Sequence, residues 1–184
     1  MVNIPNLLTV IRIGLIPVLV ALFYLPLPYG NYVTMLFFLI AVFTDWLDGV
    51  IARRLQQTSN FGAFLDPVAD KLLVTVVLIV LLQINPTTWL LLPAIIIISR
   101  EIGVSAMREW MAKSGKSAVI AVSFKGKVKT FLQMTALALL IVGSGDVYSY
   151  HFLCGLATLY LAMILTLWSL LDYMKKISIE PDSS

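Results

Sequence analysis

Four aspartates flank two strongly apolar stretches of the chain. Asp45 and Asp48 follow the run YVTMLFFLIAVFT, and Asp66 and Asp70 precede LLVTVVLIVLL. Because residues three or four positions apart share one face of a helix, each pair predicts an acidic stripe on its own helix. Carboxylates that converge need cations, and an all-oxygen set suits Mg²⁺, Mn²⁺ or Ca²⁺ better than Zn²⁺. The spacing therefore indicates a site for divalent cations, of the kind that holds a diphosphate during phosphoryl transfer.

Small and basic residues accompany the aspartates. Gly49 and Ala52 continue the first acidic stripe, and Gly62 begins the second. They lack bulk where a nucleotide would approach the helices, and Arg53 can contact a phosphate. An alternative is that the small residues only let two helices pack closely and that neighbouring basic residues neutralise the aspartates.

The composition is that of a membrane protein. Of the 184 residues, 60% are hydrophobic and 12% are charged, with a mean hydropathy of +0.95. Soluble domains have about 45–50% apolar and about 25% charged residues. We therefore expect an all-α integral membrane protein, in which residues 1–184 form a single domain of six membrane-spanning helices. The expected spans are Leu7–Leu25, Tyr32–Ala52, Gly62–Leu82, Trp89–Trp110, Phe124–Val142 and Phe152–Tyr173.

Lysine and arginine are confined to one side of this predicted topology. None of the 13 basic residues lies in the three short loops, Pro26–Asn31, Gln83–Thr88 and Gly143–Tyr150. Because basic residues concentrate in cytoplasmic loops, both termini and the longer connections 53–60 and 113–129 are predicted to face the cytoplasm, together with the aspartates. The first apolar segment is too long for a cleaved signal peptide and should be retained. The polar tail after Lys175 is expected to be frayed.

The stretch from Asp45 to Asp70 carries a longer pattern. It reads DWLDGVIARRLQQTSNFGAFLDPVAD, or D-x2-D-G-x2-A-R-x8-G-x3-D-x3-D. This pattern resembles the signature of the CDP-alcohol phosphotransferases, with every fixed position present. The resemblance implies a six-helix membrane enzyme, usually a homodimer, that replaces the CMP of a CDP-linked donor with an alcohol.

The resemblance also implies roles for individual residues. Two divalent cations, Mg²⁺ or Mn²⁺, would be held by Asp45, Asp48, Asp66 and Asp70, and Asp70 would also take the proton of the acceptor hydroxyl. The CDP pocket would be lined by Asp48, Gly49, Ala52, Arg53 and Gly62. The only histidine, His151, lies on the outer side of the predicted topology and offers no rival base.

Three further stretches extend the resemblance over nearly the whole chain: Asn3–Ile13, Ser99–Ala112 and Gly126–Thr130. They are similar to family members that join CDP-diacylglycerol to sn-glycerol 3-phosphate in the bacterial inner membrane. An acceptor with its own phosphate needs cations near the metal site, and the candidates are Arg100, Arg108, Lys127 and Lys129. Alternatively these residues anchor the helices at the lipid surface, and Arg100 forms an ion pair with the adjacent Glu101.

The first helix offers weaker candidates. In the family its start approaches the nucleotide, so Asn6 and Thr9 are possible CDP contacts. Helix capping and anchoring at the membrane surface explain Asn6, Thr9 and Arg12 equally well.

Other functions remain open at this point. Serine, inositol or a phosphorylated inositol could replace glycerol 3-phosphate as the acceptor. An intramembrane prenyltransferase also uses aspartates and Mg²⁺, but its motifs lie far apart in sequence. A divalent-cation transporter would need polar groups through the full membrane depth, whereas only Asp146 and His151 lie near the outer side.

Overall fold

The computed structural model describes the backbone of residues 4–55, 60–113 and 124–179 and the side chains at 10–44, 68–69, 71–107, 109, 111 and 128–171. Within these ranges every regular element is a helix. The helices are α1 (Ile4–Tyr24), α2 (Gly30–Leu55), α3 (Asn60–Ile84), α4 (Thr88–Lys113), α5 (Phe124–Val142) and α6 (Tyr150–Ile179). The prediction of an all-α chain with six helices is confirmed.

The helix ends differ from the predicted spans mainly where polar residues continue a helix. The bounds of α5 are those predicted, but α2 continues through Leu55, so Arg53 is helical and does not begin a connection. Helix α6 continues through Ile179, beyond Lys175, where a frayed tail was expected. No glycine or proline lies between Lys175 and Ile179, and the first helix-breaking residue is Pro181.

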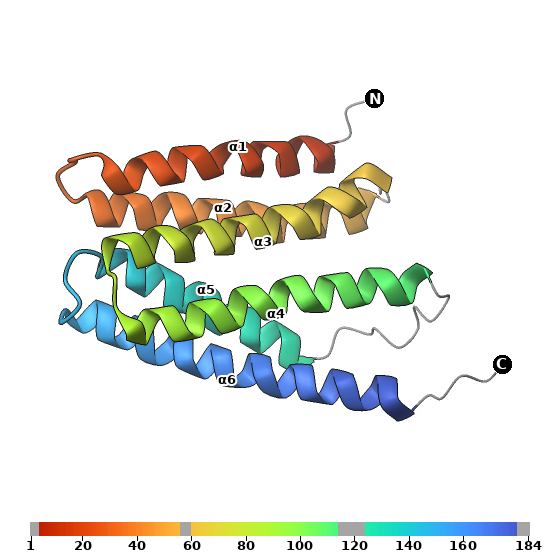
Figure 1. The fold of residues 1–184 in the computed structure, drawn as a ribbon. Helices are drawn as coiled ribbons and strands as arrows, with labels where there is room; N and C mark the ends of the chain where they lie inside the picture. Colours follow the sequence, from red (N-terminus) through yellow and green to blue (C-terminus); the bar gives the residue numbers. More distant parts are fainter. Residues whose placement is uncertain (1–3, 56–59, 114–123, 180–184) are drawn as a thin grey trace.

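Successive helices run antiparallel, so both chain ends lie at the same end of the molecule (Figure 1). We call this the termini end, and we call the opposite end, with the three short turns, the turn end. The start of α3 and the end of α2 both lie at the termini end. The three short loops without lysine or arginine all lie at the turn end.

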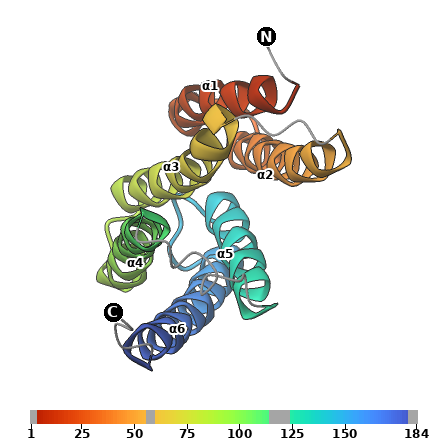
Figure 2. The same cartoon turned by 90° about the vertical axis from the view of Figure 1, so that its right-hand side faces the viewer.

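The helices form two groups, which meet where α2 packs against α5 and where α3 packs against α4 and α5. Figure 2 shows α1, α2 and α3 on one side of the molecule and α4, α5 and α6 on the other. Helix α1 packs against both α2 and α3, while α2 also packs against α5, and α3 packs against α4 and α5. Within the described residues, α2 and α3 are not among the closely packed pairs, and α1 packs against both.

The apolar core surrounds α3 and continues towards the turn end. Helix α3 contributes seven residues that are almost completely buried, Ala69, Leu73, Val74, Val77, Leu78, Val80 and Leu81. Phe38 from α2, Leu137 from α5 and Leu159 from α6 pack into the same cluster. Because the described part of α3 is packed on several sides, its buried second half fixes where the first half lies.

Helices α5 and α6 form the most closely packed pair. A Cβ atom added at Gly155 would lie 2.9 Å from both the backbone nitrogen and Cγ of Leu140 and 3.1 Å from the carbonyl oxygen of Ala136. A Cβ atom at Gly143 would meet the backbone of Phe152. These two glycines therefore allow α5 and α6 to approach each other.

Asparagine side chains tie the turns together. Asn31 Nδ2 donates to the carbonyl oxygens of Val142 at 3.1 Å and Ser144 at 2.7 Å, which links the start of α2 to the end of α5. Asn85 Oδ1 accepts from the backbone nitrogen of Gly145 at 3.0 Å. These neutral amides satisfy backbone groups that the helix ends would otherwise leave without partners.

Two helices contain a stretch long and apolar enough to cross a membrane within the described residues, Thr88–Met107 and Tyr150–Leu171. The other four contain shorter apolar stretches, Val10–Tyr24, Gly30–Thr44, Lys71–Ile84 and Val128–Val142. On the side towards the termini end, each shorter stretch stops where charged residues or side chains outside the described set begin.

Candidate active site

The backbone places the four aspartate positions at the termini end of the bundle. Asp45 and Asp48 lie in the second half of α2, and Asp66 and Asp70 lie in the first half of α3. Because each pair belongs to one uninterrupted helix, the predicted sharing of a helical face holds for the backbone positions. The side chains of all four lie outside the described set, so their convergence stays a prediction.

The depth of these positions in the bundle is similar. At about 1.5 Å per residue, Asp66 and Asp70 lie about 9 and about 15 Å from the start of α3. On the same basis, Asp48 and Asp45 lie about 10 and about 15 Å from the end of α2. Both acidic pairs therefore lie at similar distances from the helix ends at the termini end, close to where the buried residues of α3 begin with Ala69.

The predicted nucleotide-contacting residues belong to the same end of the molecule. They lie near the start of α1, in the last part of α2 and at the start of α3, and they are Asn6, Thr9, Gly49, Ala52, Arg53 and Gly62. Their side-chain positions are outside the described set. The fold thus gathers these residues on the three helices of one group, and their contacts with a nucleotide stay a prediction.

Arg12 is completely buried, with 0% of its surface exposed. The expectation that it only anchors the first helix at the membrane surface is therefore wrong. Arg12 lies about 12 Å from the start of α1, at the same level as the aspartates, and α1 packs against both helices that carry them. A buried guanidinium needs negative partners, and α2 and α3 contain no acidic residues other than these aspartates.

A second charged cluster joins α4, α5 and α6. Arg100 Nη1 donates to Glu101 Oε1 at 3.0 Å, which confirms the predicted ion pair. Lys129 Nζ donates to the same oxygen, and Arg100 Nη2 donates to Ser169 Oγ at 3.4 Å. Two of the four residues predicted to bind the acceptor phosphate, Arg100 and Lys129, therefore lie together.

The other two predicted acceptor residues lie nearby along the chain. Arg108 follows Arg100 by two helical turns on α4, and Lys127 lies in the first turn of α5. Their side chains are outside the described set. The structure brings their backbones to the termini end but does not test their contacts with Arg100 or Lys129.

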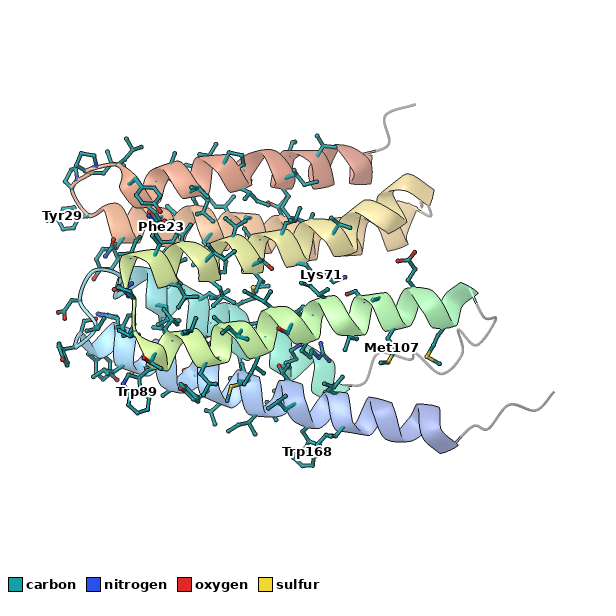
Figure 3. All side chains as sticks on the ribbon, in the orientation of Figure 1. Phe23, Tyr29, Lys71, Trp89, Met107 and Trp168 are labelled. Carbon is teal, nitrogen blue, oxygen red and sulfur yellow. The ribbon has the colours of Figure 1, made fainter. Side chains whose placement is uncertain are left out.

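Lys71 directly follows Asp70 and is partly exposed. In the view of Figure 3 its side chain lies between α3 and α4. Helix α3 packs against α4, so Lys71 lies on the side where the acidic helix group faces the helices with the second charged cluster.

The fit of a divalent cation can be judged from the donor set. Among the described side chains, no three His, Cys, Asp or Glu residues gather as a metal site. The four aspartate positions offer only carboxylate oxygens, on two helices that reach one end of the molecule at one level. Such a set fits Mg²⁺ or Mn²⁺ and does not fit a metal that prefers nitrogen and sulfur.

Comparison with known proteins agrees with the signature in the aspartate region. Residues 2–168 match the model of the CDP-alcohol phosphatidyltransferase family. The chain belongs to this family. The match includes the whole pattern from Asp45 to Asp70 and extends through the second charged cluster almost to Ser169.

Relatives within the family are similar over nearly their full length. The chain is 49% identical over 172 residues to the CDP-diacylglycerol–glycerol-3-phosphate 3-phosphatidyltransferase of Salmonella choleraesuis, covering 94% of this chain and 93% of that one. It is 49% identical over 173 residues to the enzyme of the same name from Haemophilus influenzae, with 94% and 92% covered. The enzyme of that name from Escherichia coli K12 is 48% identical over 172 residues, with 94% and 93% covered.

Proposed function

We propose that the protein transfers the phosphatidyl group of CDP-diacylglycerol to sn-glycerol 3-phosphate, which gives phosphatidylglycerophosphate and CMP. The main support is the similarity to family members named for that reaction, which are 49% identical to this chain over 94% of its length. The family signature and the grouping of its aspartate positions at one end of the bundle support it.

The reaction is a displacement at phosphorus. A hydroxyl oxygen of glycerol 3-phosphate forms a bond to the phosphorus of the phosphatidyl group, and the bond from that phosphorus to the CMP oxygen breaks. Asp70 accepts the proton of the attacking hydroxyl, and CMP leaves with the electron pair of the broken bond. No covalent enzyme intermediate is needed in this scheme.

Asp45, Asp48, Asp66 and Asp70 would hold two divalent cations, Mg²⁺ or Mn²⁺. When bound, these ions supply positive charge that balances the diphosphate and the developing charge on the leaving CMP. Arg12 adds a fixed positive charge at the same level from α1, since its burial leaves the aspartates and a bound phosphate as its available anions. The nucleotide is accommodated at Gly49, Ala52 and Gly62, and its phosphates contact Arg53.

The acceptor phosphate is bound by the basic residues of α4 and α5, Arg100, Arg108, Lys127 and Lys129. Arg100 and Lys129 support this part of the proposal because both are nearly buried and share one carboxylate. These two cationic groups lie in a site of restricted water access, where an anionic acceptor is attracted strongly.

We also propose that all six helices span the bacterial inner membrane, with the termini end in the cytoplasm. Aromatic side chains at the turn end support this, because exposed tyrosine and tryptophan are enriched where a membrane meets water; they are Tyr24, Tyr29, Tyr32, Trp89, Tyr148 and Tyr150. Figure 3 shows Tyr29 and Trp89 at this end and Trp168 on α6 nearer the other end. The family resemblance adds a homodimer to the proposal.

A comparison of acceptors tests the proposed function. Purified protein receives CDP-diacylglycerol and Mg²⁺, together with glycerol 3-phosphate, serine, inositol or inositol phosphate in separate reactions. CMP release should depend on glycerol 3-phosphate. Release with another acceptor but not with glycerol 3-phosphate would refute the proposed acceptor while keeping the family chemistry.

A further inference from the structure

Glu101 receives hydrogen bonds from cations on two different helices. Arg100 Nη1, on α4, lies 3.0 Å from Glu101 Oε1, and Lys129 Nζ, on α5, donates to that same oxygen. The side chains of Arg100 and Lys129 are 12% and 5% exposed, and that of Glu101 is 24% exposed. One carboxylate oxygen therefore holds two nearly buried cations.

This carboxylate connects helices that otherwise have little contact. Within the described residues, α4 and α5 are not among the closely packed helix pairs, whereas each packs against α6. Arg100 Nη2 also reaches Ser169 Oγ on α6 at 3.4 Å. Arg100 and Lys129 both bond Glu101 Oε1, so their positive charges lie close together and repel each other. The carboxylate of Glu101 therefore helps to hold the two cations at this separation.

The cluster is suited to an additional anion. Among the described side chains it offers two cationic groups and one carboxylate, and Arg100 Nε is buried without a hydrogen-bond partner among the described atoms. A buried donor without a partner favours a ligand that can accept a hydrogen bond. Neutral hydroxyl acceptors would gain much less from the two cationic groups than a phosphate does.

We propose that Glu101 is a positioning residue that sets the affinity for the phosphorylated acceptor by holding Arg100 and Lys129 in one arrangement. The inference rests on the proposed function, because it takes glycerol 3-phosphate as the acceptor. Glu101 touches neither the acceptor nor the reacting atoms. Loss of its charge would let the two cations move apart, and the acceptor phosphate would meet them one at a time instead of together.

The test compares Glu101→Gln with Glu109→Gln. Glu109 lies two turns further along α4 and is exposed, so its variant makes the same change in charge and size on the same helix. In Glu101→Gln, KM for glycerol 3-phosphate should rise about tenfold or more, whereas KM for CDP-diacylglycerol and kcat should change less than about threefold. Glu109→Gln should leave all three constants near those of the unmodified enzyme. A defect in folding would instead lower kcat through the active fraction and would leave both KM values unchanged.

Two milder variants keep the test decisive if Glu101→Gln does not fold. Glu101→Asp keeps the charge on a shorter side chain, and its KM for glycerol 3-phosphate should lie between the other two values. Ser169→Ala removes only the contact of Arg100 with α6, and it should raise the same KM about two- to fourfold. If Glu101→Gln folds and its KM for glycerol 3-phosphate is unchanged or lower, Glu101 is not a positioning residue. If Glu101→Gln does not fold, the same result in both milder variants leads to the same conclusion. The unmodified enzyme distinguishes a failure of the proposed function from a failure of the role of Glu101. If the unmodified enzyme does not release CMP with glycerol 3-phosphate, the proposed function is refuted.

Discussion

The two ends of the bundle handle buried polar groups in different ways. At the turn end, Asn31 and Asn85 are neutral, and each is hydrogen-bonded to backbone groups of a neighbouring turn. At the termini end, Arg12 and Lys129 are charged and almost fully buried. Neutral amides satisfy the backbone without a large desolvation cost, whereas buried charges are weak contributors to stability. The difference agrees with our proposal that the reaction takes place at the termini end, while the amides of the turn end stabilise the fold.

This comparison leads to separable effects of substitution. Changes at the termini end should alter activity, metal dependence or substrate affinity, and any loss of stability there should be partly restored by Mg²⁺. Changes at the turn end, or where α5 meets α6, should alter the free energy of unfolding with the chemistry retained. The distinction between the two ends would be wrong if turn-end substitutions changed the chemistry and termini-end substitutions changed only the stability.

The largest expected effect is that of Asp70→Asn. The amide cannot accept the hydroxyl proton and is a poorer metal ligand, so kcat should fall about 10²- to 10⁴-fold. The matched control is Asp146→Asn at the turn end, where Asp146 Oδ1 accepts from the backbone nitrogen of Tyr148 at 3.0 Å. CMP release by Asp146→Asn should stay within about twofold of the unmodified enzyme. Full activity of Asp70→Asn would remove the proposed base.

Arg12→Gln should destabilise the metal-free protein by about 3–5 kcal/mol, because it removes the buried cation that we propose to balance the aspartates. Added Mg²⁺ should then raise the apparent melting temperature of the variant more than that of the unmodified protein, since the ion replaces part of the lost charge. Lys176→Gln, in the last turn of α6, removes the same charge as a control. Equal Mg²⁺-induced shifts in all three proteins would show that Arg12 does not balance the aspartates.

Gly155→Ala should lower the free energy of unfolding by about 1–3 kcal/mol, because the new Cβ atom would be forced against α5. Gly14→Ala is the control, as a Cβ atom placed there meets no described atom within 4 Å other than its chain neighbours and the backbone of its own helix. That variant should be neutral or stabilised by up to about 1 kcal/mol. Thermal unfolding in detergent measures both, and equal melting temperatures would contradict the close approach of α5 and α6.

The smallest effect belongs to Asn31→Ala. Two carbonyl oxygens lose a donor, and the expected cost is about 1 kcal/mol in stability with unchanged KM values. Thr135→Val serves as the control, because Thr135 Oγ1 bonds only the carbonyl oxygen of Phe131 in its own helix at 2.9 Å. A change in KM for either substrate in Asn31→Ala would show that the two ends are coupled.

The sequence predicted those features that depend on local spacing. Hydrophobic length gave the six helices, residue spacing placed each pair of aspartates on one helical face, and adjacency suggested the pair of Arg100 with Glu101. The bond from Lys129 to Glu101 joins residues on different helices. Spacing along the chain could not predict it, because it depends on how α4 and α5 lie against α6.

Arg12 was misread for a related reason. Its place near the start of the first helix suggested an anchor at the membrane surface, but burial is set by packing of α1 against α2 and α3. Its distance from the helix start, more than two turns, was the available signal.

Metal dependence tests the division between the two ends most directly. CMP release from CDP-diacylglycerol and glycerol 3-phosphate is measured before chelation, after thorough chelation and after Mg²⁺ or Mn²⁺ is restored, with Asp146→Asn assayed in parallel. Activity of both proteins should disappear on chelation and return with either ion, while their folded structure persists in detergent. Undiminished CMP release from the chelated enzyme would contradict a site built from carboxylates and divalent cations.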